Sequence, residues 1–466
     1  MILDQKNQDV QDISMFLAFC KFVSLKNIIT HCCKFKVRGF RAFGIFQVLF
    51  LLVFQFRNLW RLSVSGNSSI PFARDTAYRF LNSPYHHWRA FLAVVAKKTI
   101  SFCWKLTKDD KRKVFVVDDS VYNKNRSKKL ELLSRVFDHA NEQYVKGFRF
   151  LTLAFTDGIS IIPVDFALLG TKKILCESNS DIDKRSSGFK RRLEAVMDAP
   201  SVLLSMLDNA CDIIRKGSYI VFDSWFCTPS LIREIAKREL HVTGRLKNDK
   251  THYLFRRNGK DCFVNLEQLY GKLKKIPAAV RERLQQTPDI PGSFRVCLPL
   301  VEGYEALVVR IVFVKNKSAS GSSAWLALLT TDLELTEEEV VRMYAKRWKI
   351  EEFFKVAKSL LKLEREFQSR SYDMLIAHAT LVCTRYIFLE LERRRNVDIR
   401  TCGELFWHCC EEIAELKTKE ALVLIFDALQ AFLERTSTQP QDCLKEFIKS
   451  LPAPLLRFMP DSACLC

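Results

Sequence analysis

The chain reads Tyr344-Ala-Lys-Arg-Trp-Lys-Ile-Glu-Glu-Phe-Phe-Lys-Val-Ala-Lys358 in the stretch from which its fold and function are interpreted. An α-helix turns by about 100° per residue. Four polar side chains then share an arc of about 60°: Tyr344, Arg347, Glu351 and Lys358. Apolar residues such as Ile350 and Phe353 lie opposite, so the helix can pack on a core and present its polar stripe. One carboxylate among cations suits metal-assisted phosphate chemistry, because the carboxylate holds a divalent cation while the cations contact phosphates.

Charged helices also carry such residues as a solvated face with i,i+4 pairs, here Arg347 and Glu351. The spacing, however, resembles the Y-R-E-K signature of DDE transposases of bacterial insertion sequences. That signature has a Tyr, then Arg after two residues, Glu after three more and Lys after six more, as found from Tyr344 to Lys358. The resemblance implies a ribonuclease-H-like catalytic domain and two upstream aspartates, each at the end of a strand.

The first of these aspartates is expected after the apolar run Val114-Phe-Val-Val117, which reads as a buried central strand and ends in Asp118-Asp119-Ser120. Adjacent strand residues face opposite sides, so only one aspartate can point into a given site. The family usually has a small hydroxylic residue after its first catalytic aspartate. The resemblance therefore favours Asp119, with Asp118 as the alternative.

The second aspartate is expected at Asp223, at the end of the apolar run Tyr219-Ile-Val-Phe222 and before a predicted helix from Pro229 to Glu239. The segment Asp223-Ser-Trp-Phe resembles the sequence around the second catalytic aspartate of the same transposases. The alternative for this residue is a structural one, in which its carboxylate caps the helix that follows.

The resemblance implies one site made of Asp119, Asp223 and Glu351. Three converging carboxylates repel one another unless a cation neutralises them. Two Mg²⁺ or Mn²⁺ ions are the cofactors implied. Tyr344, Arg347 and Lys358 are expected to bind the DNA phosphates around the scissile bond, since each can donate a hydrogen bond to phosphate.

The predicted fold class is α/β: a ribonuclease-H-like mixed sheet, interrupted by a β-rich insertion, with helical N- and C-terminal regions. Strands are expected at 113–120, 146–157, 159–169, 218–223, 293–300, 304–314 and 324–331. Thr156-Asp-Gly158 is a good hairpin turn. Five regions are predicted: a helical DNA-binding domain (1–110), the first part of the catalytic core (111–248), an inserted β-rich domain (249–322), the second part of the core (323–371) and a helical C-terminal region (372–466).

Helical periodicity predicts the remaining elements. Helices are expected at 13–22, 40–59, 73–80 and 88–106 in the N-terminal region, near 200–216 in the core, and at 372–394, 405–416, 421–434 and 442–450 in the C-terminal region. Ser63 to Pro71 is expected to be a loop. The segment Ala73 to Asn82 is either a recognition helix of helix-turn-helix type or a helix that merely packs.

Charge indicates a polyanionic partner. The formal net charge is +20, and residues 1–110 contain 16 Lys and Arg against 6 Asp and Glu. Such a balance favours a polyanionic partner, because each neutralised phosphate releases counterions, although an acidic membrane surface would attract the protein too. The resemblance implies that the partner is double-stranded DNA. The basic stretch from Lys172 to Arg192 is expected to be a solvated loop or a contact to the DNA backbone.

The 16 cysteines form no C-x-x-C pair, which favours reduced thiols over a zinc site or a disulfide framework. His408 beside Cys409 lacks a second ligand pair at suitable spacing. No secretory signal is evident, and the apolar run Gly44 to Phe54 is about half the length of a membrane span. We therefore expect no membrane partner, and the resemblance implies a cytoplasmic, nucleoid-associated protein of a bacterium.

The function implied is that of an insertion-sequence transposase, which cleaves DNA at element ends and transfers the strands into target DNA as a homodimer. A catalytically silent DNA-binding descendant of a transposase is the alternative from another class. A metal-dependent nuclease without strand transfer would share the same site. Trp325 and Trp348 are candidates for stacking on a flipped base if cleavage proceeds through a hairpin.

Overall fold

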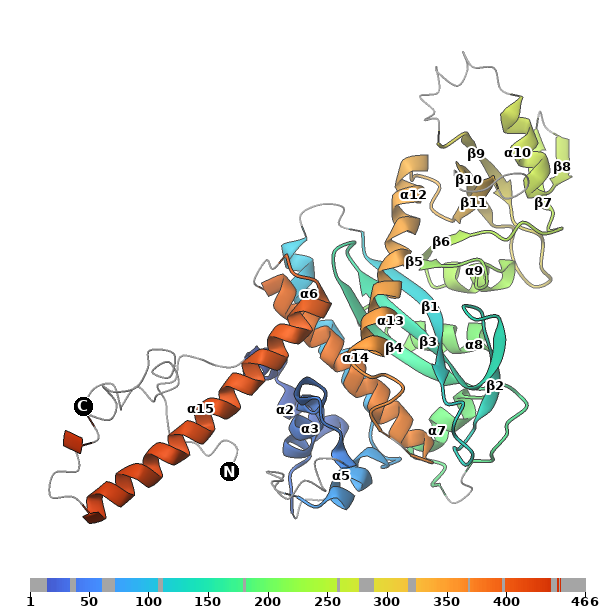
Figure 1. The fold of residues 1–466 in the computed structure, drawn as a ribbon. Coiled ribbons are helices and arrows are strands. Elements are labelled where there is room, and N and C mark those ends of the chain that lie inside the picture. Colours follow the sequence, from blue (N-terminus) through green and yellow to red (C-terminus); the bar gives the residue numbers. More distant parts are fainter. Residues whose placement is uncertain are drawn as a thin grey trace.

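The computed structural model describes residues 15–33, 39–60, 72–107, 112–178, 182–257, 260–275, 289–316, 324–367, 369–395, 399–436, 442–443 and 445. Within these ranges the chain forms helices, two 3₁₀ segments and strands (Figure 1). The helices are α1 (Met15–Val23), α2 (Leu25–Cys32), α3 (Ala42–Leu51), α5 (Arg74–Leu81), α6 (Trp88–Leu106), α7 (Ser187–Glu194), α8 (Ala199–Asn209), α9 (Pro229–Ala236), α10 (Leu266–Lys274), α12 (Glu337–Ala345), α13 (Lys349–Ser359), α14 (Tyr372–Arg395) and α15 (Cys402–Thr436), with 3₁₀ segments η1 (Val53–Gln55) and η3 (Lys346–Trp348). The strands are β1 (Val114–Asn123), β2 (Ser134–Asp138), β3 (Gln143–Thr156), β4 (Ile161–Leu169), β5 (Tyr219–Phe222), β6 (His241–Arg245), β7 (Tyr253–Arg257), β8 (Lys260–Val264), β9 (Gly292–Cys297), β10 (Val308–Lys315) and β11 (Trp325–Thr330).

All eleven strands belong to one sheet with the order β2-β3-β1-β5-β6-β11-β10-β9-β7-β8, and β4 also pairs with β3. Strand β3 is antiparallel to β1 and β4, whereas β5 and β6 run parallel to β1. The order β4-β3-β1-β5-β6 with this polarity is the ribonuclease-H-like arrangement. The predicted fold class is confirmed.

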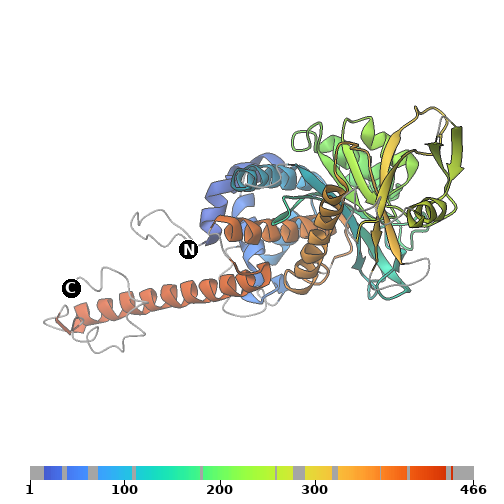
Figure 2. The same cartoon turned by 90° about the horizontal axis from the view of Figure 1, so that it is seen from above.

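The centre of this sheet is apolar on both faces, as expected for strands covered by helices on both sides. Val114 to Val117 of β1, all of β5 and all of β4 are buried. Figures 1 and 2 show α8 and α9 on one face, and α13 and α14 on the other. The hairpin turn expected between β3 and β4 is present, with Gly158 at a φ of 92° that favours glycine.

The β-rich insertion separates β6 from β11 in sequence but lengthens the same sheet in space. Strands β10, β9, β7 and β8 continue it beyond β11, and α10 lies beside them. Residues 249–322 thus contribute four of the eleven strands.

The periodicity predicted that the motif stretch would be one continuous α-helix, but the structure divides it. It comprises α12, the 3₁₀ segment η3 and α13, so the chain winds more tightly at Lys346–Trp348 before α-helical geometry resumes. In the C-terminal region, by contrast, the structure joins helices that the sequence predicted to be separate. The two helices expected at 405–416 and 421–434 are one helix, α15, which projects away from the rest of the protein in both views (Figures 1 and 2).

Helix α14 is buried for most of its length. It has 24 residues and is the one described helix that is long and apolar enough to cross a membrane, but its apolar window is wholly buried inside the protein. Helices α1 and α2 pass the same test only as a pair bent by 58°. Inside α14, the fully buried Arg385 donates to the carbonyls of Leu49 and Phe50 and pairs with Glu366, which ties the N-terminal helices to the core.

The basic stretch 172–192 is neither fully solvated nor free to contact DNA along its length. Its last two arginines belong to α7 and are buried. Arg191 and Arg192 both pair with Asp373 at the start of α14, and Arg192 also contacts Glu131. This part of the prediction is wrong because the carboxylates that neutralise the two arginines come from distant segments.

In the N-terminal region, α5 occupies the segment proposed as a recognition helix. It buries Ala77, Phe80 and Leu81 and contacts α3 and α14, so one face packs on the protein. The predicted loop 63–71 lies outside the described residues, as does nearly all of the predicted helix 442–450.

Candidate active site

Three polar residues follow equivalent positions on adjacent parallel strands. Val117, Phe222 and Gly244 are in register across β1, β5 and β6. The next residues along the chain are Asp118, Asp223 and Arg245. The carboxyl ends of parallel strands form one edge of a sheet, where open α/β folds place their ligands. Asp118, Asp223 and Arg245 thereby follow the points where the parallel pairing ends, although β1 itself continues to Asn123 in its pairing with β3.

Asp118 lies on the sheet face that is covered by α13. Its neighbour at the next same-face position, Ser120, is paired with Phe150, whose ring packs against Phe353 and Phe354 of α13. Burial, reinforced by the Asp223 carboxylate and opposed by Arg347, raises the pKa of Asp118 to about 7. The site therefore disfavours the charge of Asp118 unless a cation compensates it.

Asp119 points to the opposite face and is not brought to this group. Its carboxylate accepts two hydrogen bonds from Arg149, Nε to Oδ2 at 2.7 Å and Nη2 to Oδ1 at 2.9 Å. The Arg149 guanidinium in turn stacks on Trp225, 4.2 Å from the ring centroid. The sequence analysis favoured Asp119 as the first catalytic aspartate, but the pleat of β1 turns Asp118, and not Asp119, toward the motif helix.

Asp223 follows β5 directly and stands at the start of a tight turn. Its Oδ1 accepts the backbone N–H groups of Trp225 and Phe226, at 3.0 and 3.4 Å, while its Oδ2 makes no hydrogen bond among the described residues. The alternative that Asp223 caps the next helix is wrong, because Thr228 is the N-cap of α9. The turn holds the carboxylate at the strand end and leaves one oxygen available.

The neighbouring strand needs a glycine for this arrangement. A side chain at Gly244 would come within 2.9 Å of the Cys227 sulfur and 3.0 Å of the Phe222 ring. The absence of a Cβ lets β6 pack against the segment that carries Asp223.

The motif helix begins with a strong cap. Thr336 and Glu339 form a capping box at the start of α12, and Arg112 pairs with Glu339. These contacts connect the helix to the segment just before β1. The helical path then runs across the sheet edge, which brings Arg347 and Glu351 to Asp118.

Arg347 bridges two of the carboxylates. Its Nη1 donates to Oδ2 of Asp118 at 2.8 Å, and its Nη2 donates to Oε1 of Glu351 at 2.9 Å. The Arg347 side chain is only 12% exposed, whereas that of Glu351 is 44% exposed. Burial lowers the pKa of Arg347, but the two carboxylates and Tyr344 outweigh that effect and leave it raised.

Tyr344 belongs to the same group, with the Arg347 guanidinium 6.0 Å from its ring centroid. Its ring is partly buried, and burial raises the pKa of its hydroxyl, while the charges of Arg347 and Arg245 oppose the shift and that of Asp223 adds to it. Tyr344 is thus close enough to interact with both arginines and with the second aspartate. Arg245 was missed by the sequence analysis, and the only local signal for it is its place directly after a glycine at the end of an apolar strand.

Lys358 lies one step further along the motif. Its ammonium donates to the Val121 carbonyl of β1 at 2.6 Å and pairs with Glu364 at 3.3 Å. It is held against the same strand as Asp118, but three residues beyond it. The structure therefore brings Asp118, Asp223, Tyr344, Arg347 and Glu351 together, and places Lys358 at their side.

The donor set of this site fits a hard divalent cation. Its acidic groups are carboxylates, the ligands that Mg²⁺ and Mn²⁺ prefer. No three ligand-type side chains in the described part of the chain already converge at metal-binding distance, and Arg347 supplies the positive charge between Asp118 and Glu351. His408 and Cys409, considered as ligands from the sequence, form no such group there either.

Two family models match the chain. One, described as DDE superfamily endonuclease, matches residues 51–259, and the other, described as transposase DDE domain, matches residues 199–388. Between them they include every residue of the site. None of the curated proteins matches the chain.

Among solved structures, the chain is similar to one described as the synaptic complex of piggyBac transposase with hairpin DNA. The two are 11% identical over 94% of this chain and 85% of that chain, with a TM-score of 0.45. A likeness this distant does not bear on individual residues.

Proposed function

The chain belongs to the DDE superfamily of transposases and endonucleases, and on that premise we propose that it cuts DNA at the ends of its own element and joins those ends to target DNA. The observation that carries the proposal is the convergence of Asp118 and Asp223, from neighbouring parallel strands, with Glu351 from the motif helix. Carboxylates from two strands and a helix that lie together can hold a catalytic metal. The reaction then needs no covalent intermediate between protein and DNA.

Transposases with DDE domains generally use divalent metal ions. We propose that Asp118, Asp223 and Glu351 hold Mg²⁺ or Mn²⁺, and that two ions are used. When bound, such ions activate the attacking oxygen and stabilise the leaving oxygen of an in-line displacement at phosphorus. The buried position of Asp118 beside Asp223 supports this assignment, since two neighbouring carboxylates favour a cation between them.

The remaining polar residues would position DNA. Arg347, Arg245 and Tyr344 surround the carboxylates, and each can donate a hydrogen bond to a phosphate oxygen. Lys358 lies beside the site, where it could contact the DNA strand as that strand leaves the carboxylates. Its partners Val121 and Glu364 fix the ammonium in place. In this scheme the cationic residues hold the scissile phosphate in line and exclude bulk water.

The partner proposed is double-stranded DNA, which the net charge of +20 favours. Joining two element ends in one reaction requires that two ends be held together, so we propose a homodimer on DNA. We further propose that the protein acts on the chromosome of a bacterial cell, as an insertion-sequence enzyme would.

The test is a cleavage assay on plasmid DNA that carries the flanking ends of the element, with Mg²⁺ or Mn²⁺. We expect nicks or breaks at the ends and, with target DNA present, joined products. Glu351→Gln should abolish both reactions but retain end binding. Cleavage without joined products would favour a nuclease, and binding without cleavage by the wild-type protein would favour a silent DNA-binding descendant.

A further inference from the structure

A basic hollow lies beside the C-terminal half of α13. It has a volume of about 360 Å³ and is lined by Phe354, Lys355, Lys358, Ser359, Lys362 and Arg365. Four of these six residues are cations, and none of the described residues that line the hollow is acidic. Lys355 and Arg365 are exposed and have no ion pair among the described residues. Lys358, the last residue of the motif, lines this hollow and lies beside the candidate active site.

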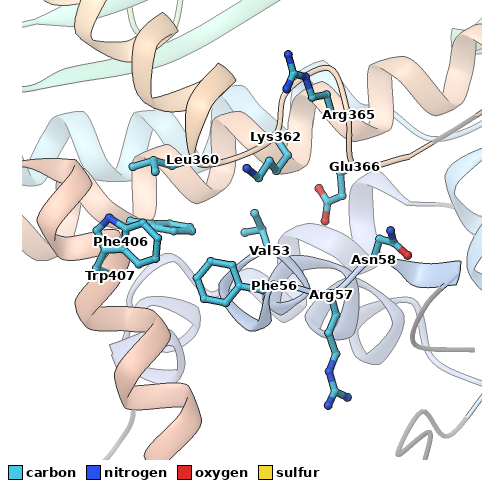
Figure 3. A pocket seen from close by; sticks show the side chains of 10 residues that line it. All are labelled: Val53, Phe56, Arg57, Asn58, Leu360, Lys362, Arg365, Glu366, Phe406 and Trp407. Atoms are coloured by element: carbon cyan, nitrogen blue, oxygen red, sulfur yellow. The ribbon is translucent and has the colours of Figure 1, made fainter. Parts of the chain in front are cut away.

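A second cavity, of about 330 Å³, shares Lys362 and Arg365 with the first. Figure 3 shows aromatic side chains from two separate segments facing this cavity, with Lys362 and Arg365 on the loop after α13. The rings of Phe56 and Trp407 stack with centroids 5.6 Å apart and planes 27° apart. The two cavities share Lys362 and Arg365 on their walls, and we call the two together the basic-aromatic groove.

The aromatic end of this groove is open to solvent. Phe56 is 58% exposed and Trp407 is 51% exposed, although both are large apolar side chains. Phe56 also has a φ of 52°, a left-handed conformation that is unfavourable for a bulky residue. An exposed, stacked aromatic pair held in a strained backbone is an uncommon feature of a surface that contacts only water.

The only carboxylate on the wall of the second cavity is already neutralised. Glu366 accepts from the buried Arg385, Nη2 to Oε1 at 2.8 Å. Burial raises the pKa of Glu366, but Arg385 and His378 outweigh that effect and lower it, so the carboxylate stays ionised and paired. The other charged residues around the cavity are Arg57, Lys362 and Arg365, which are all cationic and form no ion pair with another described residue.

We propose that the basic-aromatic groove binds an unpaired segment of a DNA strand next to the scissile phosphate. Phosphates would lie among Lys355, Lys358, Lys362 and Arg365, and a base would stack on the Phe56 and Trp407 pair. Sites for single-stranded nucleic acid combine these two features, a cationic groove for the backbone and aromatic faces for the bases. A duplex keeps its bases stacked on one another, so only an unpaired base can use the aromatic end.

This inference rests on the proposed action on DNA, and binding measurements separate the two. Full-length protein in EDTA, which prevents cleavage, is titrated into fluorescein-labelled oligonucleotides in three forms: single-stranded, duplex, and duplex with a single-stranded extension. We expect Trp407→Ala to lose about tenfold in affinity for the two forms with unpaired bases and little for the duplex. Lys362→Ala with Arg365→Ala should weaken all three and reduce their salt dependence.

Matched controls come from the inserted strands and α10, which lie far from the groove in Figures 1 and 2. Phe263→Ala removes a similarly exposed aromatic ring from β8, and Lys275→Ala removes one exposed positive charge. Equal effects of Trp407→Ala and Phe263→Ala, or a uniform loss on all three DNA forms, would overturn the proposal.

A second measurement does not depend on the stability of a variant. Wild-type protein is irradiated with single-stranded oligonucleotides that contain 5-bromodeoxyuridine, and the crosslinked peptides are identified by mass spectrometry. Crosslinks at Phe56 or Trp407 are expected, and crosslinks confined to other aromatic residues would refute the groove. A protein that binds duplex but not single strands would also refute the groove and leave the proposed function standing, whereas a protein that binds no DNA would remove both.

Discussion

Nη1 of Arg347 lies 2.8 Å from Oδ2 of Asp118, although the two residues are 229 positions apart in the chain. The contact joins the motif helix to the middle of β1, and it identifies which of two adjacent aspartates faces that helix. The Arg347 and Asp118 side chains are 12% and 17% exposed, so neither charge is well hydrated. Arg347 thereby holds together carboxylates that would otherwise repel one another.

The first prediction separates the two aspartates of β1. Asp118→Asn should abolish cleavage, because it removes an oxygen ligand from the proposed metal site. Asp119→Asn should retain cleavage within about tenfold, because Asp119 acts only through Arg149 and the turn that holds Asp223. The measurement is the rate of plasmid cleavage with Mn²⁺ for both variants.

Thermal unfolding of the same two proteins provides the control. Asp119→Asn should be the less stable variant, by about 1 kcal/mol, since it removes the ion pair with Arg149 and replaces one of the two accepting oxygens with an NH₂ group. Cleavage by Asp118→Asn together with inactivity of a folded Asp119→Asn would transfer the catalytic role to Asp119.

The strands and the motif helix could be predicted from the sequence because each carries a strong local signal. The strands that deliver Asp118 and Asp223 are unbroken apolar runs bounded by polar residues, and α12 begins with a capping box at Thr336. Which residues of β1 point to which face of the sheet could not be predicted in the same way. Val114 to Val117 are buried on both faces, so their sequence contains no alternation that tells one face from the other.

Other features depend on pairing or on distant partners. Arg245 reaches the site only through the register of β6 with β5, which no local pattern specifies. The buried state of Arg191 depends on Asp373, far along the chain. The unbroken helix α15 was predicted as two because Lys417 to Glu420 is polar, but this interval contains neither Gly nor Pro to stop a helix.

The second prediction concerns metal binding without catalysis. Millimolar Mn²⁺ should raise the melting temperature of the wild-type protein by a few degrees, because an ion that binds only the folded state stabilises it. EDTA should reverse the shift and abolish cleavage. Asp118→Asn and Glu351→Gln should each reduce the shift, as measured by differential scanning fluorimetry.

Glu352→Gln is the matched control for the metal titration. Glu352 is adjacent to Glu351 but pairs with Lys349 on the exposed side of α13. This variant should keep the full Mn²⁺ shift. Equal loss of the shift in Glu351→Gln and Glu352→Gln would argue against Glu351 as a ligand.

The third prediction tests Arg245, the residue that the strand register adds to the site. Arg245→Ala should weaken binding of element-end DNA by about tenfold and lower the salt dependence of binding, because one cationic contact to phosphate is lost. Fluorescence anisotropy at several salt concentrations measures both quantities. Lys275→Ala removes the same charge from an exposed position on the inserted region and should have little effect. The role of Arg245 would be refuted by identical salt slopes in the two variants.

The fourth prediction concerns the buried Arg385. Arg385→Met should destabilise the protein by about 3–5 kcal/mol, because it leaves the Glu366 carboxylate without its charged partner. The double variant with Glu366→Gln should recover part of that loss, since both members of the buried pair are then neutral. Urea unfolding followed by circular dichroism gives the free energies. A double variant less stable than Arg385→Met would contradict this account.

The fifth prediction is a pH dependence at the start of the motif helix. Hydrogen bonding to the Thr336 backbone N–H, with help from Arg112, lowers the pKa of Glu339 to about 2. Because the folded pKa lies below the ordinary value of 4.5, this stabilisation is complete above pH 4.5 and is lost as the pH falls toward 2. Glu339→Gln keeps the capping geometry but has no charge to titrate. The stability difference between wild type and Glu339→Gln, measured by urea unfolding, should therefore be largest at neutral pH and shrink steadily between pH 4.5 and 3. A difference that does not change over this range would show that the Glu339 charge contributes nothing to the cap.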